Sequence, residues 1–288
     1  MMKVVRRRAD LEKARRDLLL DETGHAVVPT MGALHEGHLS LVDVARQHAP
    51  KVSATIFVNP KQFGPNEDLA RYPRSEEQDL AMLEKRGVDL VYIPRTEDMY
   101  PPGHQTGVRV GSLAEPLDGA SRPNFFGGIA TVVTKIFMQM KPTVGVFGEK
   151  DYQQLLVIRR FTEDLNLGVK IIGAPIVRER DGLAMSSRNR YLTPPERRIA
   201  GDLNVIMRKV CGRIEGGVPV AAAIIQGLDD MEAVGLRPVD YLEVRSGRDL
   251  TLLPERVLRQ EEIADARLFA AVMLGGTRLI DNMPVNEQ

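Results

Sequence analysis

The sequence contains few residues of several types, and each shortage excludes a class of protein. Cys211 is the only cysteine among 288 residues, which excludes an intrachain disulfide and a cysteine-ligated zinc site. Tryptophan is absent, aromatic residues make up 5% of the chain, and 39 basic residues balance 39 acidic ones. A neutral chain with so few aromatic side chains is not typical of proteins that bind nucleic acids or anionic membranes.

Long hydrophobic runs are also absent. A membrane-spanning helix needs about 20 predominantly apolar residues, whereas the longest uncharged apolar run in the second half, residues 216–228, is shorter. The basic N-terminal segment lacks the apolar stretch of a secretory signal. Together with the single cysteine, these features predict a cytoplasmic protein that has no membrane partner.

Short β-branched runs alternate with segments of helical period up to about residue 178. We predict strands in residues 26–28, 52–58, 88–93, 143–147 and 169–177, and helices in residues 39–49, 75–86, 129–140 and 152–165. Such alternation is typical of right-handed βαβ units, so we predict an α/β fold with a Rossmann-like, doubly wound parallel sheet. Ligands of such sheets bind beyond the carboxyl ends of the strands.

The pattern changes in the last third of the chain. A polar loop precedes a helix that should begin near Thr193 and continue to Ile214, and a second helix is predicted in residues 220–234. Strands are expected near residues 240–244 and 267–274, with a glycine turn into residues 277–280. We therefore predict two domains, residues 1–178 and a smaller α+β domain of residues 179–288. A basic cluster near the N-terminus, which includes Arg15, is interpreted as a solvated helix face.

Two histidines follow the first predicted strand in the segment PTMGALHEGH. His35 and His38 are three residues apart, so both imidazoles should lie on one side of a helix that begins near His35. The N-terminal end of a helix attracts anions, and imidazole N–H groups can donate to phosphate oxygens. The pair therefore indicates phosphate binding. A purely structural role and a two-histidine metal site are the alternatives, and the metal site lacks a clear third ligand nearby in the sequence.

Three later segments carry polar groups in loops. Asn59 and Gln62 in FVNPKQFG have neutral amides that can hold hydroxyls and carboxylates, and residues 64–74 after them are expected to form a movable lid. Lys150 in GEKDYQQL and Arg188 in DGLAMSSRNRYL are placed to contact phosphates. None of these segments is a Walker A loop, and no GxGxxG fingerprint follows the first strand. Taken singly, each could instead be a surface loop, a helix start or a polar linker.

Five motifs, in this order between residues 28 and 192, make the chain resemble the pantothenate synthetase (pantoate–β-alanine ligase) family of the nucleotidyltransferase α/β superfamily: PTMGALHEGH, FVNPKQFG, ARYPR, GEKDYQQL and DGLAMSSRNRYL. The resemblance implies an AMP-forming ligase. The carboxylate of (R)-pantoate attacks the α-phosphorus of ATP, giving pantoyl adenylate and pyrophosphate, and the amine of β-alanine then displaces AMP to give pantothenate. The resemblance also implies a homodimer, Mg²⁺ bound with ATP, and a C-terminal domain that closes over the ATP site.

The resemblance implies roles for individual residues as well. The expected catalytic residues are His38, His35, Lys150 and Arg188, with His38 as the proton donor. The expected substrate-binding residues carry side-chain amides: Gln62 and Gln154 from the resemblance, and Asn59 from its place in the same loop as Gln62. The expected ATP-binding residues are Met31, Gly32, Ala33, Leu34, His35, Glu36, Gly37, His38, Gly148, Glu149, Lys150, Asp151, Val177, Met185, Ser186, Ser187 and Arg188. No metal ligand is predicted, and Asp79 is a candidate only for an outer-shell role.

Two departures from the family pattern lie near the expected pantoate site. Lys61 stands where the family usually has methionine, and Asn124 and Phe125 replace a Gly-His pair. One alternative function is that of another nucleotidyltransferase, which activates a different carboxylic acid or a phosphate ester. Another is that of a nucleotide-binding regulator without catalysis.

Overall fold

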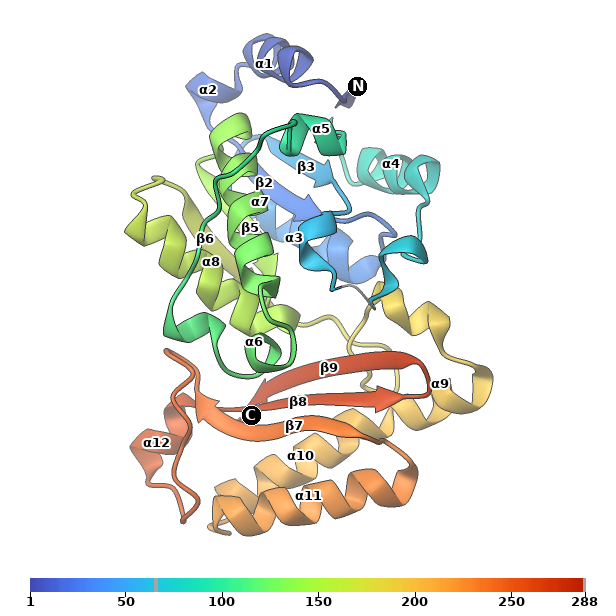
Figure 1. Ribbon diagram of the computed structural model, residues 1–288, viewed down its shortest axis with the longest axis vertical. Helices are drawn as coiled ribbons and strands as arrows, with labels where there is room; N and C mark the ends of the chain where they lie inside the picture. The colour runs from blue at the N-terminus through green and yellow to red at the C-terminus, as the bar shows by residue number, and fades with distance from the viewer. Residues whose placement is uncertain (65–66, 287–288) are drawn as a thin grey trace. The chain divides into compact units, whose positions relative to one another are not determined.

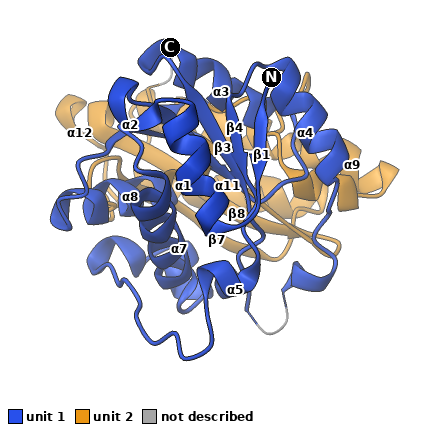
Figure 2. Ribbon diagram, turned by 90° about the horizontal axis from the view of Figure 1, so that it is seen from above, with its two compact units in different colours: residues 1–149, 153–175 blue, residues 150–152, 176–288 orange. Residues whose placement is uncertain are grey.

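The computed structural model describes residues 1–64 and 67–286. The chain divides into two compact units (Figure 2): unit 1 comprises Met1–Glu149 and Gln153–Pro175, and unit 2 comprises Lys150–Tyr152 and Ile176–Gln288. The three residues Lys150–Tyr152 therefore belong to unit 2 although both neighbouring segments belong to unit 1.

Unit 1 is built on a six-stranded parallel sheet. Its strands are β1 (Lys3–Val5), β2 (Ala26–Thr30), β3 (Val52–Ile56), β4 (Leu90–Tyr92), β5 (Val144–Gly148) and β6 (Lys170–Ala174). They are arranged in the order β1-β4-β3-β2-β5-β6, and all neighbouring pairs are parallel. Every residue of β3 is buried, as expected of a strand that is covered on both faces.

Helices cover both faces of this sheet. The α-helices of unit 1 are α1 (Arg8–Asp17), α2 (Leu20–Thr23), α3 (Glu36–His48), α4 (Glu76–Lys85), α5 (Thr96–Met99), α6 (Asp118–Ser121), α7 (Phe125–Met140) and α8 (Tyr152–Asp164), whose first residue is in unit 2. Ala26 and Val28 of β2 pack in one cluster with α3, while Val27 points to the opposite face and is also fully buried. On that opposite face, α7 lies over the central strands (Figure 1).

Unit 2 combines helices with a three-stranded antiparallel sheet. Its helices are α9 (Pro194–Ala200), α10 (Asp202–Glu215), α11 (Val220–Val234) and α12 (Gln260–Asp265). Its strands β7 (Val239–Ser246), β8 (Ala266–Leu274) and β9 (Thr277–Pro284) pair in the order β7-β8-β9. Apolar residues of α10 and α11 form one core with the inner face of this sheet.

The predicted fold class is confirmed, since a parallel α/β sheet is followed by a smaller sheet with helices. Two details differ. The three residues of β1 were not predicted, because so short a strand shows no periodicity. The helix predicted to run from Thr193 to Ile214 is two helices that meet at Gly201, where a side chain would lie 2.8 Å from the Asp181 carboxylate.

The interpretation of Arg15 as part of a solvated helix face is wrong. Arg15 is 4% exposed, forms a bidentate ion pair with Asp21 and donates to the Gln139 carbonyl at 2.9 Å. Arg15 thus connects α1 to the C-terminal end of α7 through the Gln139 carbonyl. A count of basic residues cannot reveal this packing role.

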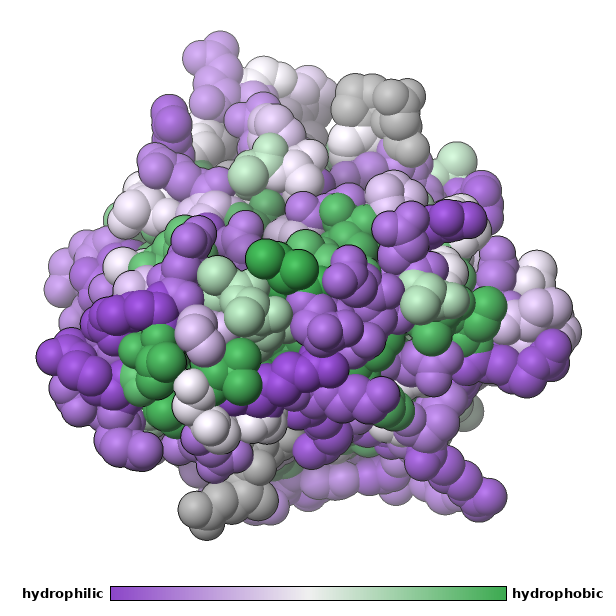
Figure 3. All heavy atoms as spheres, turned by 90° about the horizontal axis from the view of Figure 1, so that it is seen from below, coloured by the Kyte–Doolittle hydropathy of each residue, from purple (hydrophilic) through white to green (hydrophobic). Residues whose placement is uncertain are grey.

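In residues 1–64 and 67–286, no helix has both the length and the apolar composition to cross a membrane. Unit 2 exposes a few large apolar side chains, among them Val205, Ile225 and Leu252. On the face shown in Figure 3, hydrophobic groups are separated by hydrophilic ones, which is usual for a protein surface.

Candidate active site

The loops after β2, β3 and β5 begin at the same edge of the sheet of unit 1. These strands are parallel neighbours in the order β3-β2-β5, so their carboxyl ends lie side by side. In the sheet, β3 lies on one side of β2 and β5 lies on the other. The chain therefore builds the sheet outward from β2 in one direction, through β3 and β4, and then in the opposite direction, through β5 and β6. Such a switch point is the usual ligand site of an open α/β sheet. The loop after β2 carries His35 and His38.

The two histidines lie together at the N-terminal end of α3, as predicted. His35 is the N-cap residue with extended backbone angles, and its carbonyl accepts from the backbone N–H groups of His38 and Leu39 at 2.8 and 3.1 Å. The ring centroids of the two imidazoles are 4.1 Å apart, and the Nδ1 atoms of both rings are buried. Among the described residues, no group of three His, Cys, Asp or Glu side chains is placed to hold a metal ion.

The loop before these histidines has an unusual backbone that Asp79 stabilises. Gly32 and Ala33 both have positive φ angles, 82° and 51°. The backbone N–H groups of Ala33 and Leu34 donate to the two carboxylate oxygens of Asp79 at 2.8 and 2.9 Å. Asp79 lies in α4, is 2% exposed and also accepts from the Ser75 hydroxyl. Successive backbone N–H groups form a concavity that binds anions, and here a carboxylate of the chain itself fills it.

A hydrogen-bonded amide cluster follows β3. Asn59 is 1% exposed, and its side-chain nitrogen donates to the Gly128 carbonyl at 3.2 Å and to the Gln62 side-chain oxygen at 3.0 Å. Its side-chain oxygen accepts from the Lys61 backbone N–H and from the Tyr100 hydroxyl. Because a carbonyl can only accept and a backbone N–H can only donate, these contacts fix the orientation of the Asn59 amide. Gln62 therefore uses its oxygen toward Asn59, so its NH₂ group takes no part in this contact.

Tyr100 and α7 hold this cluster in place. Burial raises the pKa of Tyr100, so its hydroxyl stays protonated and remains a donor to Asn59. Gly128 of α7 packs against the turn η1 (Pro60–Gln62) so closely that a Cβ atom there would lie 2.1 Å from the Lys61 carbonyl oxygen. The position of Gln62 thus depends on a glycine in a helix about seventy residues later in the chain.

The two departures from the family pattern have clear local contacts. The Lys61 ammonium lies 4.6 Å from the centroid of the Tyr100 ring and 3.4 Å from Nδ1 of His104. Burial lowers the pKa of His104, and so do the charges of Lys61 and Lys135. Asn124 has a φ of 70°, a left-handed conformation that asparagine and glycine tolerate best.

Part of the segment that we predicted to be a lid can be described. Positions 65 and 66 of residues 64–74 lie outside the described residues. Glu67 accepts two hydrogen bonds of 2.7 Å from Arg122, which also donates to the Gln62 carbonyl at 3.1 Å. The guanidinium carbon of Arg122 lies 3.5 Å from the centroid of the Phe125 ring.

The β5 loop adds Gly148 and Glu149, and α8 adds Gln154. Gly148 is the last residue of β5 and pairs with Ala174 of β6. Gln154 is half-buried in the first turn of α8. Its neighbour Gln153 is buried and binds the segment before α6 and the first residue of α6 through three hydrogen bonds, so Gln153 has a structural role.

The remaining predicted residues lie in unit 2. Residues 177–185 form a short hairpin, in which the Met185 N–H donates to the Val177 carbonyl at 3.0 Å. Ser186 caps the following turn η5 (Ser187–Tyr191) by accepting from the Arg188 N–H at 3.3 Å, and Ser187 is 6% exposed. The Lys150 side chain is 19% exposed, with its ammonium 3.9 Å from the Asp151 carboxylate. Unit 2 thus holds a serine-arginine turn and a partly buried lysine.

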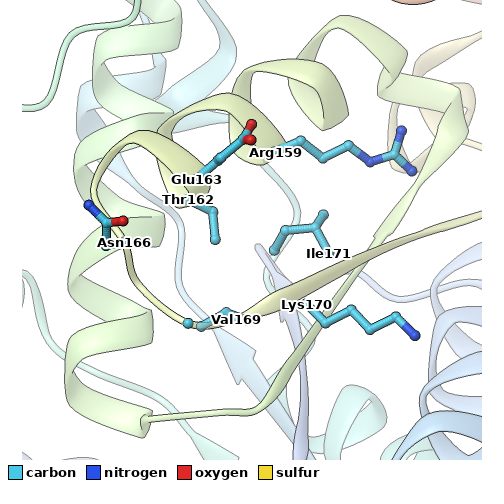
Figure 4. Close-up of a pocket in the computed structure, with 8 residues that line it drawn as sticks. Arg159, Thr162, Glu163, Asn166, Val169, Lys170 and Ile171 are labelled. Atoms are coloured by element: carbon cyan, nitrogen blue, oxygen red, sulfur yellow. The ribbon is translucent and has the colours of Figure 1, made fainter.

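A pocket of about 410 Å³ lies elsewhere in unit 1 (Figure 4). Arg159 and Glu163 line it from α8, and Lys170 and Ile171 line it from the start of β6. It is therefore near the amino end of β6, and none of the predicted site residues lines it. The switch-point loops, not this pocket, carry the groups suited to chemistry.

Comparison with known proteins identifies close relatives along the whole chain. Residues 3–284 match the family model described as pantoate-beta-alanine ligase. The pantothenate synthetase of Caulobacter vibrioides is 51% identical over 260 residues, which is 90% of each chain, and that of Rhizorhabdus wittichii is 47% identical over 284 residues, which is 99% of each. The crystal structure of the pantothenate synthetase of Thermus thermophilus has a TM-score of 0.92 at 44% identity and covers 99% of this chain and 100% of that one. The pantoate-beta-alanine ligase of Francisella tularensis, complexed with beta-gamma ATP and beta-alanine, has a TM-score of 0.84 at 31% identity and covers 100% of this chain and 99% of that one.

Proposed function

Because the chain belongs to the pantoate–β-alanine ligase family, we propose that it forms pantothenate from (R)-pantoate and β-alanine in two steps. In the first, the pantoate carboxylate attacks the α-phosphorus of ATP, which forms pantoyl adenylate and releases pyrophosphate. In the second, the β-alanine amine attacks the acyl carbon, and AMP leaves. The observation that carries this proposal is the pair of adjacent imidazoles at the N-terminal end of α3, at the switch point of the sheet.

The first step brings two anions together, so it needs groups that offset their repulsion. His35 and His38 supply N–H donors at the positive end of the α3 dipole. In this proposal His38 donates to the phosphate that accumulates charge, and His35 stabilises the same charge from the adjacent position. No covalent nucleophile is required, and Cys211 is buried within the core of unit 2.

Gln62 is proposed to hold pantoate and β-alanine through its NH₂ group, because its side-chain oxygen already accepts from Asn59, whose own side chain is almost fully buried. Asn59, which we expected to bind substrate, would therefore act by orienting Gln62. Gln154 at the start of α8 supplies a second amide for pantoate.

ATP is proposed as the co-substrate, which is supported by the ATP ligand of the Francisella relative. Its expected contacts are residues 31–38, 148–151, 177 and 185–188, with Lys150 and Arg188 as the cations for the phosphates. Mg²⁺ would be bound mainly by phosphate and water oxygens. The donor set of the loop fits this arrangement, because both carboxylate oxygens of Asp79 already accept from backbone N–H groups.

We also propose that the enzyme works in the cytoplasm as a homodimer. Light scattering that gives about twice the 32.0 kDa chain mass would support the dimer, and a mass equal to one chain would refute it.

A pyrophosphate-release assay tests the proposed function. We expect release that requires both ATP and pantoate, with AMP appearing once β-alanine is added. Release with a different acid, and none with pantoate, would favour another nucleotidyltransferase, whereas ATP binding without turnover would favour a regulator.

The same assay tests the role of His38. We predict that His38→Ala slows pyrophosphate release by about 10²–10³, the usual cost of losing one transition-state donor. His48→Ala, at the exposed end of the same helix, is the matched control and should retain the wild-type rate. A normal rate in His38→Ala would contradict the proposed role.

A further inference from the structure

Two consecutive polar residues of β9, Asp281 and Asn282, are buried in unit 2. They are 4% and 2% exposed, although the last hundred residues gave no functional motif. Burial of polar groups is unfavourable unless they are hydrogen-bonded, so their partners show what the two residues do.

Asn282 holds the backbone of Lys150. Its side-chain nitrogen donates to the Lys150 carbonyl at 2.9 Å, and its side-chain oxygen accepts from Arg267. Arg267 is 9% exposed, and its guanidinium carbon lies 3.9 Å from the centroid of the Tyr152 ring. The Tyr152 hydroxyl in turn donates to the Gly247 carbonyl at 3.0 Å. Both ends of the segment Lys150–Tyr152 are therefore attached to the C-terminal part of the chain.

Asp281 holds the hairpin that precedes the serine-arginine turn. Arg178 donates to both Asp281 oxygens, at 2.6 and 3.0 Å, and also to the Gly182 carbonyl at 3.1 Å. The side chains of this ion pair are 16% and 2% exposed, and bidentate geometry fixes their relative orientation. The hairpin leads directly into residues 186–188.

We propose that Asp281 and Asn282 are positioning residues that hold Lys150 and the turn of residues 186–188 in a fixed relation for the first reaction step. Neighbouring residues of one strand anchor the two segments, so each segment has a defined place relative to the other. The inference rests on the proposed function, in which both segments contact ATP phosphates. A displacement of about 1 Å in a phosphate-contacting group is enough to cost roughly 10² in rate.

The test uses Asn282→Asp, because aspartate has nearly the same shape and can still accept from Arg267 but cannot donate to the Lys150 carbonyl. The two half-reactions are measured separately in the full-length enzyme. The first is pyrophosphate release from ATP and pantoate, and the second is pantothenate formation from synthetic pantoyl adenylate and β-alanine. We expect the first to slow by about 10–10² and the second to remain close to wild type. Equal losses in both would overturn the proposal, because a general structural defect affects both steps.

A double-mutant cycle with Lys150→Ala separates positioning from an independent effect. If Asn282 acts through Lys150, Asn282→Asp should cause little further loss in the Lys150→Ala enzyme. Full additivity of the two losses would overturn the proposal. Asp281→Asn provides a second readout and should raise the KM for ATP more than the KM for pantoate, whereas equal changes in the two would count against the role of Asp281.

Arg278→Ala is the matched control on the same strand. It removes a partly exposed ion pair of 2.7 Å with Asp240, and both half-reactions should stay near wild type. A wild-type enzyme that releases no pyrophosphate with pantoate would refute the proposed function itself. That failure appears without any substitution, so it is distinguishable from a failure of the positioning role alone.

Discussion

Replacement of Asp79 by alanine should destabilise the protein far more than an average substitution in α4. The carboxylate accepts from the backbone N–H groups of Ala33 and Leu34, and also from the Ser75 hydroxyl. A hydrogen bond to a charged group contributes about 1.5–3 kcal/mol to stability, so loss of the two backbone bonds alone should cost about 3–6 kcal/mol. Ala33 keeps a positive φ of 51° that this carboxylate helps to enforce.

Urea unfolding followed by circular dichroism measures this loss. Asp79→Asn should cost less than Asp79→Ala, because the amide oxygen can still accept one of the two N–H groups. Glu77→Ala is the matched control, since Glu77 is exposed in the first turn of the same helix. A free energy of unfolding for Asp79→Ala within about 0.5 kcal/mol of the wild type would refute the reasoning, because that is the usual range of an exposed substitution.

The same variants should lose activity in the first reaction step. The loop that Asp79 holds leads directly into His35, the N-cap of α3, so a relaxed loop changes the position of the imidazole pair. We expect pyrophosphate release by Asp79→Ala to fall under conditions in which the variant is still folded. Unchanged release in the folded variant would show that the loop does not position the histidines.

Two further predictions concern buried groups of unit 1. Burial, and secondarily the charge of Arg15, lowers the pKa of His25 to about 4. The His25 imidazole binds a proton near pH 6.5 in the unfolded chain but not in the folded chain. The stability that neutral His25 provides is therefore complete above pH 6.5 and is lost as the pH falls to 4, which lowers the free energy of unfolding by up to about 3 kcal/mol. Urea unfolding of His25→Leu should show a shallower dependence of this free energy on pH over that range, and an unchanged slope would contradict the assignment. Gly128→Ala should raise the KM for pantoate by at least tenfold, because its Cβ atom would clash with the Lys61 carbonyl. Gly127→Ala is the control, since the nearest contact of its Cβ atom would be at 3.8 Å. A wild-type KM in Gly128→Ala would contradict the role of this close packing.

The elements that the sequence predicted well are those with strong local signals. The apolar, β-branched runs of β2, β3 and β5 mark buried strands, and the start of α3 near His35 follows from the helical spacing after it. The capping box of Thr193 and Glu196 marks the start of α9. The break at Gly201 was missed; the Asp181 carboxylate that a side chain there would meet comes from another segment.

The contacts that organise the candidate site could not be predicted, because their partners are distant in the sequence. Asp79 binds a loop 45 residues earlier, and Asn282 binds a carbonyl 132 residues earlier. A hydrogen bond of this kind depends on the tertiary arrangement and leaves no periodic trace around either residue. The sequence therefore predicted residues for the proposed chemistry, but not which residues hold their loops in place.

The strand β9 nevertheless contains one local signal of its role. Side chains of a strand alternate between its two faces, and residues Thr277, Leu279, Asp281 and Met283 share the buried face. Asp281 is thus an acidic residue at one of the alternating positions of β9 where a buried, apolar residue is expected. A buried carboxylate must be paired or strongly hydrogen-bonded, so this break in the pattern predicts a cation against β9. The cation is Arg178, and since Arg178 lies in the hairpin before residues 186–188, Asp281 marks the place where the C-terminal sheet holds the segment that leads into this turn.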